Sequence, residues 1–496
     1  MCVIGSGAGG AVVASVLVDA GWDVLVVEQG QHVPAGTYLN DLIPGFETAR
    51  ARTIDGRWTE QGYPWTACCV GGGTRFYAGV SLRLRRIDFD ASAHVVPEAL
   101  PPAWPFGYDE LHPHYDWVER RLGVTSDGGL DPYRPAPALD VLPPHLPSAR
   151  GAVLSAAARS RGLSPFPMPL AVASRQFGAA PACTDLTTCT DYACPTGAKG
   201  DVYQRLLAPL RSAPNLTLRT GLKALQLVER RTGQVGGLRC LELATGRVET
   251  VRAGLFVVAA NAIQSSALLL RSRSGSSPAG LGNGNDMVGR GLCMKVAQNL
   301  TGRLRPGLLA DADLPANGGR YVTMALSDHY LDADCPTGLG GIILETGPLA
   351  VADRADPLLL RLECLLADQP MAGNRVLVDG SVLTIDYRPH PVDLRRLAFM
   401  RERATTLLAA AGADDVAAEP LDFTLGSGHL HGTCRMGTDR RTSVCDPTGR
   451  VHTADNVFVA DGALMPYPGG VNPALTIQAL AHRVATHLVA TGPSTN

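Results

Sequence analysis

The pattern of apolar and polar residues at the start of the chain predicts two buried strands around a helix. Cys2–Ile4 is predicted to end a strand, Ala11–Ala20 to form an apolar helix and Asp23–Gly30 to form a second buried strand. The glycine-rich turn GSGAGG, Gly5–Gly10, joins the first strand to the helix. This order of elements is typical of the βαβ unit that binds dinucleotides. Because the chain starts only four residues before Gly5, we expect that further apolar residues upstream would stabilise the first strand.

Each glycine of this turn has an expected task. Gly5 allows the tight turn, Gly7 lets the backbone approach a pyrophosphate, and Gly10 lets the helix pack closely on the strand. Glu28 lies 18 residues after Gly10, where an acid can bind a ribose 2′-hydroxyl. An acid at this place argues against a 2′-phosphate, and therefore against NADP. The motif alone does not distinguish FAD from NAD.

Further along the chain, strands and helices give way to short alternating strands. Trp104–Val124 is predicted to end in an amphipathic helix, and Gly254–Ser272 has the order strand, turn, helix. Five short runs between about residues 300 and 423 predict an antiparallel sheet: Tyr321–Leu326, Gly341–Leu344, Leu359–Leu366, Val376–Val378 and Val382–Tyr387. A helix is predicted over Pro391–Ala411, and a last strand over Asn456–Ala463.

Composition and charge exclude several classes of protein. The chain has 496 residues, enough for two domains, with 45% hydrophobic and 18% charged residues. The net charge of −2 gives no electrostatic reason to expect nucleic acid or an anionic membrane as partner. No apolar run reaches the ~20 residues of a membrane span, and with Gly5 so early in the chain we expect no signal peptide. We therefore expect a cytoplasmic protein.

The cysteines do not indicate a metal site. Twelve cysteines are scattered along the chain, and the one cluster is Cys183, Cys189 and Cys194. Its spacing fits no standard zinc pattern, and no histidine is interleaved with it. We expect these three to be loop or buried thiols. Lys199, which follows them, is expected to be a solvated charge at the start of a helix rather than a ligand contact.

Two segments near the C-terminus carry the candidate chemistry. The first is GSGHLHGTCRMG, residues 426–437, and the second is DGALMPYPGGVNPALTIQALAHRV, Asp461–Val484. In the second, Asn472 is a favourable N-cap and Pro473 a favourable first residue for a helix over Ala474–Val484. A helix N-terminus that faces a site stabilises negative charge there. On the residues alone, Asn472 is also well explained as a simple cap, and His429 as a buried, hydrogen-bonded histidine.

Together these two segments resemble the C-terminal signature of the glucose-methanol-choline (GMC) flavoprotein oxidoreductases. The resemblance implies an α/β fold, with a Rossmann-like FAD-binding domain and an interleaved substrate domain on an antiparallel sheet. It implies that His429 accepts a proton beside the flavin, and that Asn472 is its partner. His431 stands where the family does not require histidine, so we give it no catalytic role. We expect residues 1–120, 195–300 and 425–496 to bind FAD, and residues 121–194 and 301–424 to bind substrate.

The resemblance also assigns cofactor contacts outside the first βαβ unit. CCVGGGTRFYAG, residues 68–79, looks like the family's second flavin loop, which places Gly72, Gly73 and Thr74 beside the flavin. Some members attach flavin covalently through a histidine in this loop. Phe76 stands at that place here, so non-covalent FAD is expected. Near the C-terminus, the expected cofactor contacts are Asp461, Gly462 and Pro473.

A nearly end-to-end similarity points to the branch of the family that acts in aminoglycoside antibiotic biosynthesis. It is carried by EQGYPWTACCVGGGTRFYAGVSLRLRRIDFDA, SDHYLDADCPTGLGGIILE, GSGHLHGTCR and LMPYPGGVNPALTIQA. This implies oxidation of the primary 6′-hydroxyl of a paromamine-like aminoglycoside to the 6′-aldehyde, with O2 reduced to H2O2. A PLP aminotransferase would then convert the aldehyde to an amine. Because such substrates are polycations, four acids are candidate substrate contacts: Asp328, Asp332, Asp334 and Glu345.

Three other functions stay open from the sequence. The protein could be an oxidase or dehydrogenase of another sugar or of a sterol alcohol, because the fold alone does not select a substrate. It could be a lyase on the same fold. It could be a flavin-binding protein without catalysis, although the presence of both His429 and Asn472 argues against this.

Overall fold

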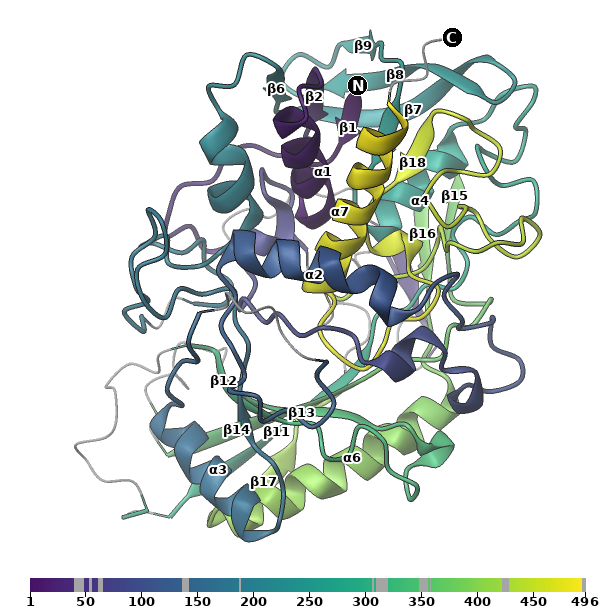
Figure 1. Ribbon diagram of the computed structural model, residues 1–496. Helices are drawn as coiled ribbons and strands as arrows, with labels where there is room; N and C mark the ends of the chain where they lie inside the picture. The colour runs from purple at the N-terminus through teal and green to yellow at the C-terminus, as the bar shows by residue number, and fades with distance from the viewer. Residues whose placement is uncertain are drawn as a thin grey trace.

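The structure of the protein is a computed structural model (Figure 1). It describes residues 1–39, 49–52, 56–60, 66–135, 142–186, 189–305, 307–308, 320–347, 356, 358–421 and 428–492. Two large sheets form the frame, one above the other in Figure 1, and α2 (Tyr108–Leu122) crosses the region between them.

The upper sheet is parallel and has five strands in the order β18-β10-β1-β2-β6. These strands are β18 (Val457–Val459), β10 (Phe256–Val258), β1 (Cys2–Ile4), β2 (Val24–Val27) and β6 (Leu216–Arg219). Three of them, β1, β10 and β18, are completely buried. A parallel strand covered on both faces needs such a continuous apolar run. The predicted first βαβ unit therefore lies at the centre of the sheet.

Helices and a small meander surround this parallel sheet. The helices α1 (Ala8–Asp19) and α7 (Ala474–Thr491) pack on each other, and α2 packs on α7 (Figure 1). The helix α4 (Ala262–Arg271) packs on the antiparallel meander, whose three strands are β7 (Leu222–Arg231), β8 (Gln234–Glu242) and β9 (Val248–Val251).

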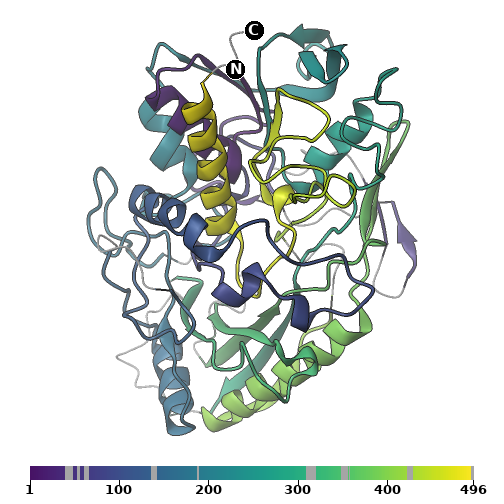
Figure 2. The same cartoon turned by 45° about the vertical axis from the view of Figure 1, so that its right-hand side comes forward.

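The lower sheet is antiparallel and has six strands in the order β17-β11-β14-β13-β12-β5. These strands are β17 (Ala413–Ala418), β11 (Val296–Leu304), β14 (Leu359–Leu366), β13 (Gly341–Thr346), β12 (Val322–Leu326) and β5 (Phe166–Pro167). The helices α6 (Pro391–Ala410) and α3 (Ala149–Ser160) cover the face that points away from the parallel sheet (Figures 1 and 2). The opposite face is left to line the space between the two sheets.

The structure confirms the predicted class, a dinucleotide-type α/β unit joined to an antiparallel sheet, and it corrects several details. The last two of the five short strands predicted for the antiparallel sheet correspond to β15 (Arg375–Asp379) and β16 (Val382–Asp386), and they do not join that sheet. They form a separate sheet with β3 (Ala49–Arg52) and β4 (Trp58–Thr59). The helix expected after Lys199 is a short π turn over Tyr203–Leu207 followed by a 3₁₀ turn. Among the elements that the sequence pattern did not indicate are β11, β17 and α3. The predicted limits of the two domains stay a prediction.

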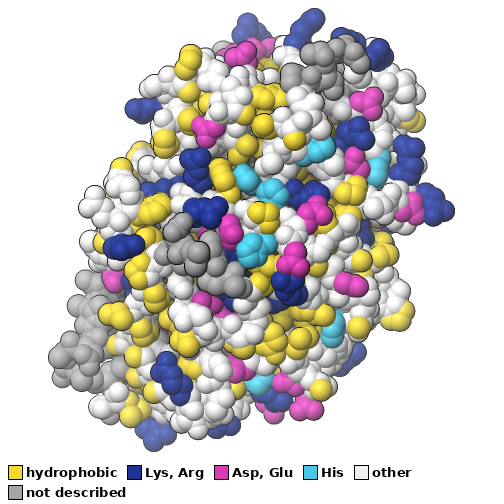
Figure 3. All heavy atoms as spheres, in the orientation of Figure 1, with side chains coloured by type: hydrophobic (Ala, Val, Ile, Leu, Met, Phe, Trp, Pro, Cys, Tyr) yellow, Lys and Arg dark blue, Asp and Glu magenta, His cyan; other side chains and the backbone are white. Residues whose placement is uncertain are grey.

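The surface agrees with the composition. On the face seen in Figure 3, basic and acidic side chains are mixed rather than gathered by sign, as a net charge of −2 suggests. Among the helices that the structure describes, none combines the length and apolarity needed to cross a bilayer.

Candidate active site

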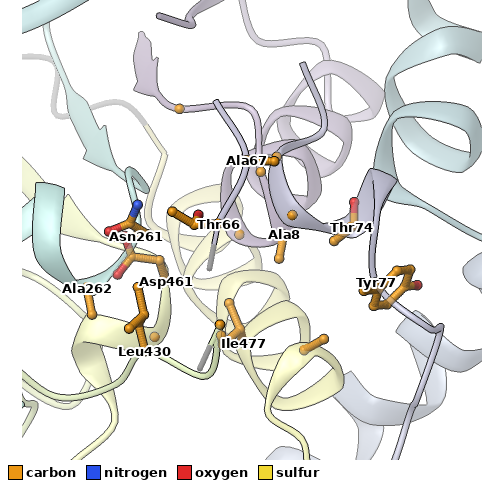
Figure 4. Close-up of a pocket in the computed structure, with 18 of the residues that line it drawn as sticks. Ala8, Thr66, Ala67, Thr74, Tyr77, Asn261, Ala262, Leu430, Asp461 and Ile477 are labelled. Atoms are coloured by element: carbon orange, nitrogen blue, oxygen red, sulfur yellow. The ribbon is translucent and has the colours of Figure 1, made fainter. Parts of the chain in front are cut away.

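A cavity of about 730 Å³ lies between the two sheets. One part of its wall comes from the first βαβ unit and the loop after Thr66, and another from the C-terminal segments around His429 and Asn472. The antiparallel sheet supplies the remaining wall through Ala297, Tyr321, Val322, Leu344 and Glu363. Figure 4 shows Thr74 and Tyr77 on one side of the cavity and Asn261 and Asp461 on the other.

The glycine turn is shaped to receive a phosphate-bearing group. A Cβ on Gly5 would lie 2.4 Å from the Ala259 carbonyl oxygen, and a Cβ on Gly10 would lie 2.0 Å from the Gly5 carbonyl oxygen. Both glycines are therefore required by close packing within the protein. Gly7 differs, because its Cβ would meet nothing nearer than Gly72 Cα at 3.9 Å. Gly7 lines the cavity at the N-terminus of α1, where backbone N–H groups and the helix dipole favour an anion.

Glu28 lies at the cavity wall just after β2, as predicted. Its Oε2 accepts hydrogen bonds from the Ser6 amide at 2.9 Å and the Ser6 hydroxyl at 2.7 Å, and its Oε1 accepts one from Gly30 N–H at 2.9 Å. Burial raises the pKa of Glu28, and these hydrogen bonds oppose the rise. A carboxylate oxygen has a second acceptor direction, so Glu28 can hold the turn and also accept from a ribose hydroxyl.

The loop after β4 packs directly against the glycine turn, where Gly71 N–H donates to the Ser6 hydroxyl at 3.2 Å. Gly72, Gly73 and Thr74 all line the cavity, and the Thr74 hydroxyl donates to Gly71 O at 2.7 Å. Phe76 is fully buried in a separate small core with Cys69 and Ala193. Its ring therefore points away from the cavity.

Asp461 and Gly462 line the cavity just after β18. Asp461 accepts from the Ser265 hydroxyl at 2.5 Å and from Ala463 N–H at 2.9 Å. Burial raises the pKa of Asp461 to about 6, against the effect of these two hydrogen bonds. A Cβ on Gly462 would lie 2.3 Å from Leu430 O. Gly462 is thus needed to let the segment carrying His429 pass close to β18.

His429 and Asn472 meet at the cavity wall. The first two residues of the histidine segment, 426 and 427, lie outside the described residues, whereas His429 itself is described. The Asn472 side-chain N–H group donates to His429 Nε2 at 3.2 Å. Both side chains line the cavity and are partly exposed to it. Two segments 43 residues apart thus place one acceptor and one donor side by side.

Asn472 is not the helix cap that its place in the sequence indicated. The helix α7 begins at Ala474, its N-cap is Pro473, and no side chain caps it. The correction has a physical reason, since the Asn472 side chain bonds His429 instead of an N–H group in the first turn of α7. The Asn472 side chain is released toward His429, and its Oδ1 is buried without a hydrogen-bond partner among the described residues. The uncapped N-terminus of α7 lies at the cavity, where Pro473 and Ala474 line the wall.

His429 is held as a neutral base. Burial lowers the pKa of His429 to about 3, and the positive charge of Lys295 adds to this lowering. At neutral pH the ring is uncharged and can accept a proton. His431 is fully buried, and neither of its ring nitrogens has a partner among the described residues. It is not among the residues that line the described cavity.

Two buried side chains that the sequence did not single out hold the loop before Asn472. The Lys295 ammonium donates to Pro468 O at 2.5 Å and also to Gly469 O. The Tyr330 hydroxyl accepts from Gly470 N–H at 2.8 Å and donates to Asp88. Lys295 and Tyr330 thus hold three successive residues of this loop. A signal was present for Lys295, because it is one of only three lysines in the chain.

The four acids expected to bind substrate are not among the residues that line the described cavity. Asp328 accepts from Ser164 N–H at 3.0 Å, and Asp332 pairs with His329 at 2.9 Å. Asp334 is exposed. Glu345 is buried and accepts from Thr323 N–H at 2.9 Å and the Thr323 hydroxyl at 2.6 Å. The acid that the antiparallel sheet does place in the cavity is Glu363.

The expectation for Lys199 was wrong. The side chain is buried, and its ammonium donates to Cys189 O at 2.6 Å and Tyr192 O at 2.9 Å. It closes the loop that contains Cys189 and Cys194, which is the reason for its burial. In the described part of the chain, no group of three His, Cys, Asp or Glu side chains is arranged to hold a metal ion.

The chain is similar to several known proteins. Models of the GMC oxidoreductase family match residues 63–301 and 374–481. The chain is 48% identical to paromamine 6′-oxidase of Streptomyces fradiae, over 97% of this chain and 90% of that protein. It is 46% identical to 6‴-hydroxyparomomycin C oxidase of Streptomyces lividus, over 99% of this chain and 92% of that protein. The crystal structure of formate oxidase shares its fold, with a TM-score of 0.72 at 15% identity over 99% of this chain and 98% of that chain.

Proposed function

Since the chain belongs to the GMC oxidoreductase family, we propose that it oxidises the primary 6′-hydroxyl of a paromamine-like aminoglycoside to an aldehyde. FAD would accept the electrons of the alcohol, and O2 would take them up as H2O2. The observation that carries the proposal is the contact between His429 and Asn472 at the wall of the cavity of about 730 Å³. The two aminoglycoside oxidases with 46% and 48% identity support the substrate class.

His429 and Asn472 would form different hydrogen bonds with the substrate hydroxyl. Because their nitrogens are 3.2 Å apart, one substrate oxygen can contact both. The alcohol O–H donates to His429 Nε2, and the Asn472 N–H group donates to the same oxygen. Bound FAD supplies the acceptor for the hydride that leaves the carbinol carbon. As the C–H bond of the carbinol carbon breaks, His429 would take the hydroxyl proton, and the carbon–oxygen bond would become the carbonyl of the aldehyde.

The surrounding residues keep His429 neutral and hold Asn472 in place before this proton transfer. The lowered pKa of His429 keeps the ring neutral before reaction. Lys295 and Tyr330 hold the loop that carries Asn472, and fixed geometry of this kind can supply several kcal/mol, about 7–11 at best. The N-terminus of α7 at the cavity favours negative charge on the group bound there.

The FAD is proposed to be non-covalent. Phe76 offers no nucleophile and points into its own small core. Cys68 lines the cavity, but burial raises the pKa of its thiol to about 12, so the reactive thiolate is scarce. The Tyr77 hydroxyl, also in the wall, donates to Gly200 O at 3.0 Å. Precipitation with acid should therefore leave a colourless pellet and a yellow supernatant, and a yellow pellet would contradict this assignment.

The proposed cofactor contacts follow from the positions of the residues in the wall. Gly7 and the first turn of α1 would receive the pyrophosphate, and Glu28 the ribose hydroxyl. The remaining contacts are Gly72, Gly73, Thr74, Asp461, Gly462 and Pro473. Gly5 and Gly10 would act through close packing of the turn. The aldehyde product is the type of compound that a PLP aminotransferase converts to an amine, and we propose such an enzyme as the next in sequence.

The test is anaerobic. Paromamine is added to the purified yellow protein, and the oxidised flavin band near ~450 nm is followed. Loss of the band, reversed by air with release of peroxide, is the expected result. A parallel titration with 6‴-hydroxyparomomycin C decides which of the two hydroxyl positions is preferred. If neither compound reduces the flavin but another sugar or a sterol does, the aminoglycoside assignment is wrong.

A further inference from the structure

Glu363 lies on the substrate side of the cavity, in the middle of β14. Its neighbours in the chain, Leu362 and Cys364, are fully buried, and α6 packs on β14. Side chains alternate between the two faces of a strand. Glu363 therefore belongs to the opposite face, the one that lines the cavity together with Leu344, its partner in register on β13.

The Glu363 carboxyl group has no bonded partner in the part of the chain that the structure describes. Among the described residues, none forms a hydrogen bond or an ion pair with it. The nearby cation, Arg361, is engaged elsewhere: its guanidinium binds both Glu419 oxygens at 3.0 and 3.2 Å and donates to the Tyr321 hydroxyl at 2.8 Å. Burial raises the pKa of Glu363, and Arg361 opposes the rise.

A second hydrogen-bond acceptor lies beside Glu363 on the neighbouring strand, on the same face of the sheet. Asn299 on β11 is the register partner of Glu363, and residues paired in this way have their side chains on the same face. The Asn299 Oδ1 atom is buried and has no partner among the described residues. A buried acceptor atom without a donor is costly unless a ligand supplies one. An ammonium group has three donors and a positive charge.

We propose that Glu363 is the ammonium-binding residue of the substrate site, with Asn299 as a second acceptor beside it. The proposal rests on the function proposed above. A protonated amino group of the aminoglycoside would bind at Glu363, while the hydroxyl to be oxidised lies against His429 and Asn472. The sheet thereby selects an aminated sugar, whereas His429 and Asn472 alone would accept many primary alcohols.

The first test compares Glu363→Gln with Glu402→Gln, the same change of acid to amide at an exposed position. Hydrogen bonds to a charged group are worth about 1.5–3 kcal/mol. Glu363→Gln should therefore raise KM for paromamine by about ten- to a hundredfold, with kcat changed by less than about threefold. Flavin content should be unchanged. Glu402→Gln should leave both constants as in the wild type. Equal KM values for the two variants would overturn the role of Glu363.

A second test changes the substrate, so its main comparison uses only the wild-type protein. N-acetylated paromamine keeps the primary hydroxyl but carries no ammonium group. The wild type should bind it more weakly than paromamine by about the factor that Glu363→Gln causes. Glu363→Gln should lose little further affinity for it, because the two changes remove the same contact. Equal wild-type KM values for the two compounds would contradict the proposal.

The two proposals fail in different ways. If neither paromamine nor 6‴-hydroxyparomomycin C reduces the wild-type flavin, the proposed function is wrong and the role of Glu363 falls with it. If the wild type is reduced but the Glu363 variant and the acetylated compound show no effect, only the role of Glu363 is wrong. Calorimetric binding of paromamine to His429→Ala, with and without Glu363→Gln, measures the contact separately from turnover.

Discussion

The two walls of the cavity are built from different parts of the chain. The cofactor wall consists mainly of backbone: glycines at Gly7 and Gly72, the N-terminus of α1 and the end of β18. The substrate wall is the face of an antiparallel sheet, so its contacts are side chains such as Tyr321 and Glu363. His429 and Asn472 line the cavity that these two walls enclose.

This difference explains how the two walls can change. A backbone cradle needs glycine at fixed positions, since any side chain there would collide with the protein or fill the space for the ligand. A sheet face tolerates many side chains, because each points into the cavity without altering the strand. We infer that the cofactor wall fixes the type of chemistry, whereas the sheet selects the alcohol.

The largest effect is expected from His429→Ala, at the junction of the two walls. Removing a general base costs about 10²–10⁴-fold in rate, so we expect flavin reduction by substrate to slow by about a thousandfold. The FAD should be retained, because the cradle of glycines is untouched. Stopped-flow absorbance under anaerobic conditions measures the rate. Near-normal reduction would remove His429 from the mechanism, and His431→Ala serves as the control histidine.

The cofactor wall could be predicted from the sequence for the same reason that it is built from backbone. Gly5, Gly7, Gly10 and Glu28 stand at fixed spacings, and local geometry requires those spacings wherever the unit occurs. The predicted strand Leu359–Leu366 agrees with β14 at both ends. An apolar run of that kind is a strong local signal.

The substrate wall could not be predicted in this way. An acid in a loop, such as Asp328 or Asp334, and an acid in a strand, such as Glu363, look alike until the register is known. Shifting a strand by one residue moves every side chain to the other face. Asn472 shows the same limit, because local preference indicated a cap and the contact with His429 depends on the tertiary fold.

A pair of glycine variants tests whether the cofactor wall acts through backbone. A Cβ on Gly7 has room within the protein, with its nearest contact at 3.9 Å, and the backbone φ of −74° suits alanine. Gly7→Ala should leave the apoprotein within about 0.5 kcal/mol of the wild-type stability. It should weaken FAD binding by about tenfold or more, because the methyl group lies where the backbone meets the pyrophosphate.

Gly10→Ala is the contrasting variant. Its Cβ would lie 2.0 Å from Gly5 O, so the apoprotein itself should lose about 1–3 kcal/mol by overpacking. Urea unfolding of the apoproteins and fluorescence titration with FAD measure the two quantities. Equal loss of stability in both variants would show that Gly7 serves packing and not the ligand.

A smaller effect is expected from the two buried lysines. Lys295 holds the loop before Asn472, whereas Lys199 holds the loop of Cys189 and Tyr192. Each lysine changed to Met leaves buried carbonyl groups unpaired, at about 1–3 kcal/mol, so both variants should melt at lower temperature. Only Lys295→Met should also slow flavin reduction per bound flavin, by about tenfold, through misplacement of Asn472. Equal reduction rates for the two variants would contradict the positioning role of Lys295.

The smallest effect concerns pH, and it tests whether the site holds His429 neutral by burial. The reaction needs neutral His429, the form present above its pKa. Since burial and Lys295 lower that pKa to about 3, the rate of flavin reduction should be level between about pH 5 and 7 and show no step near the ordinary histidine value of about 6.5. The free energy of unfolding should also fall as the pH falls. Between about pH 6.5 and 3 His429 binds a proton in the unfolded protein but not in the folded one. The contribution of His429 to stability is therefore complete above about pH 6.5 and is lost as the pH falls toward 3. Lys295→Met removes the smaller of the two causes, so its acid limb should move only modestly toward neutral pH. A wild-type step near pH 6.5 would mean that substrate and water reach His429 more freely than the cavity geometry allows.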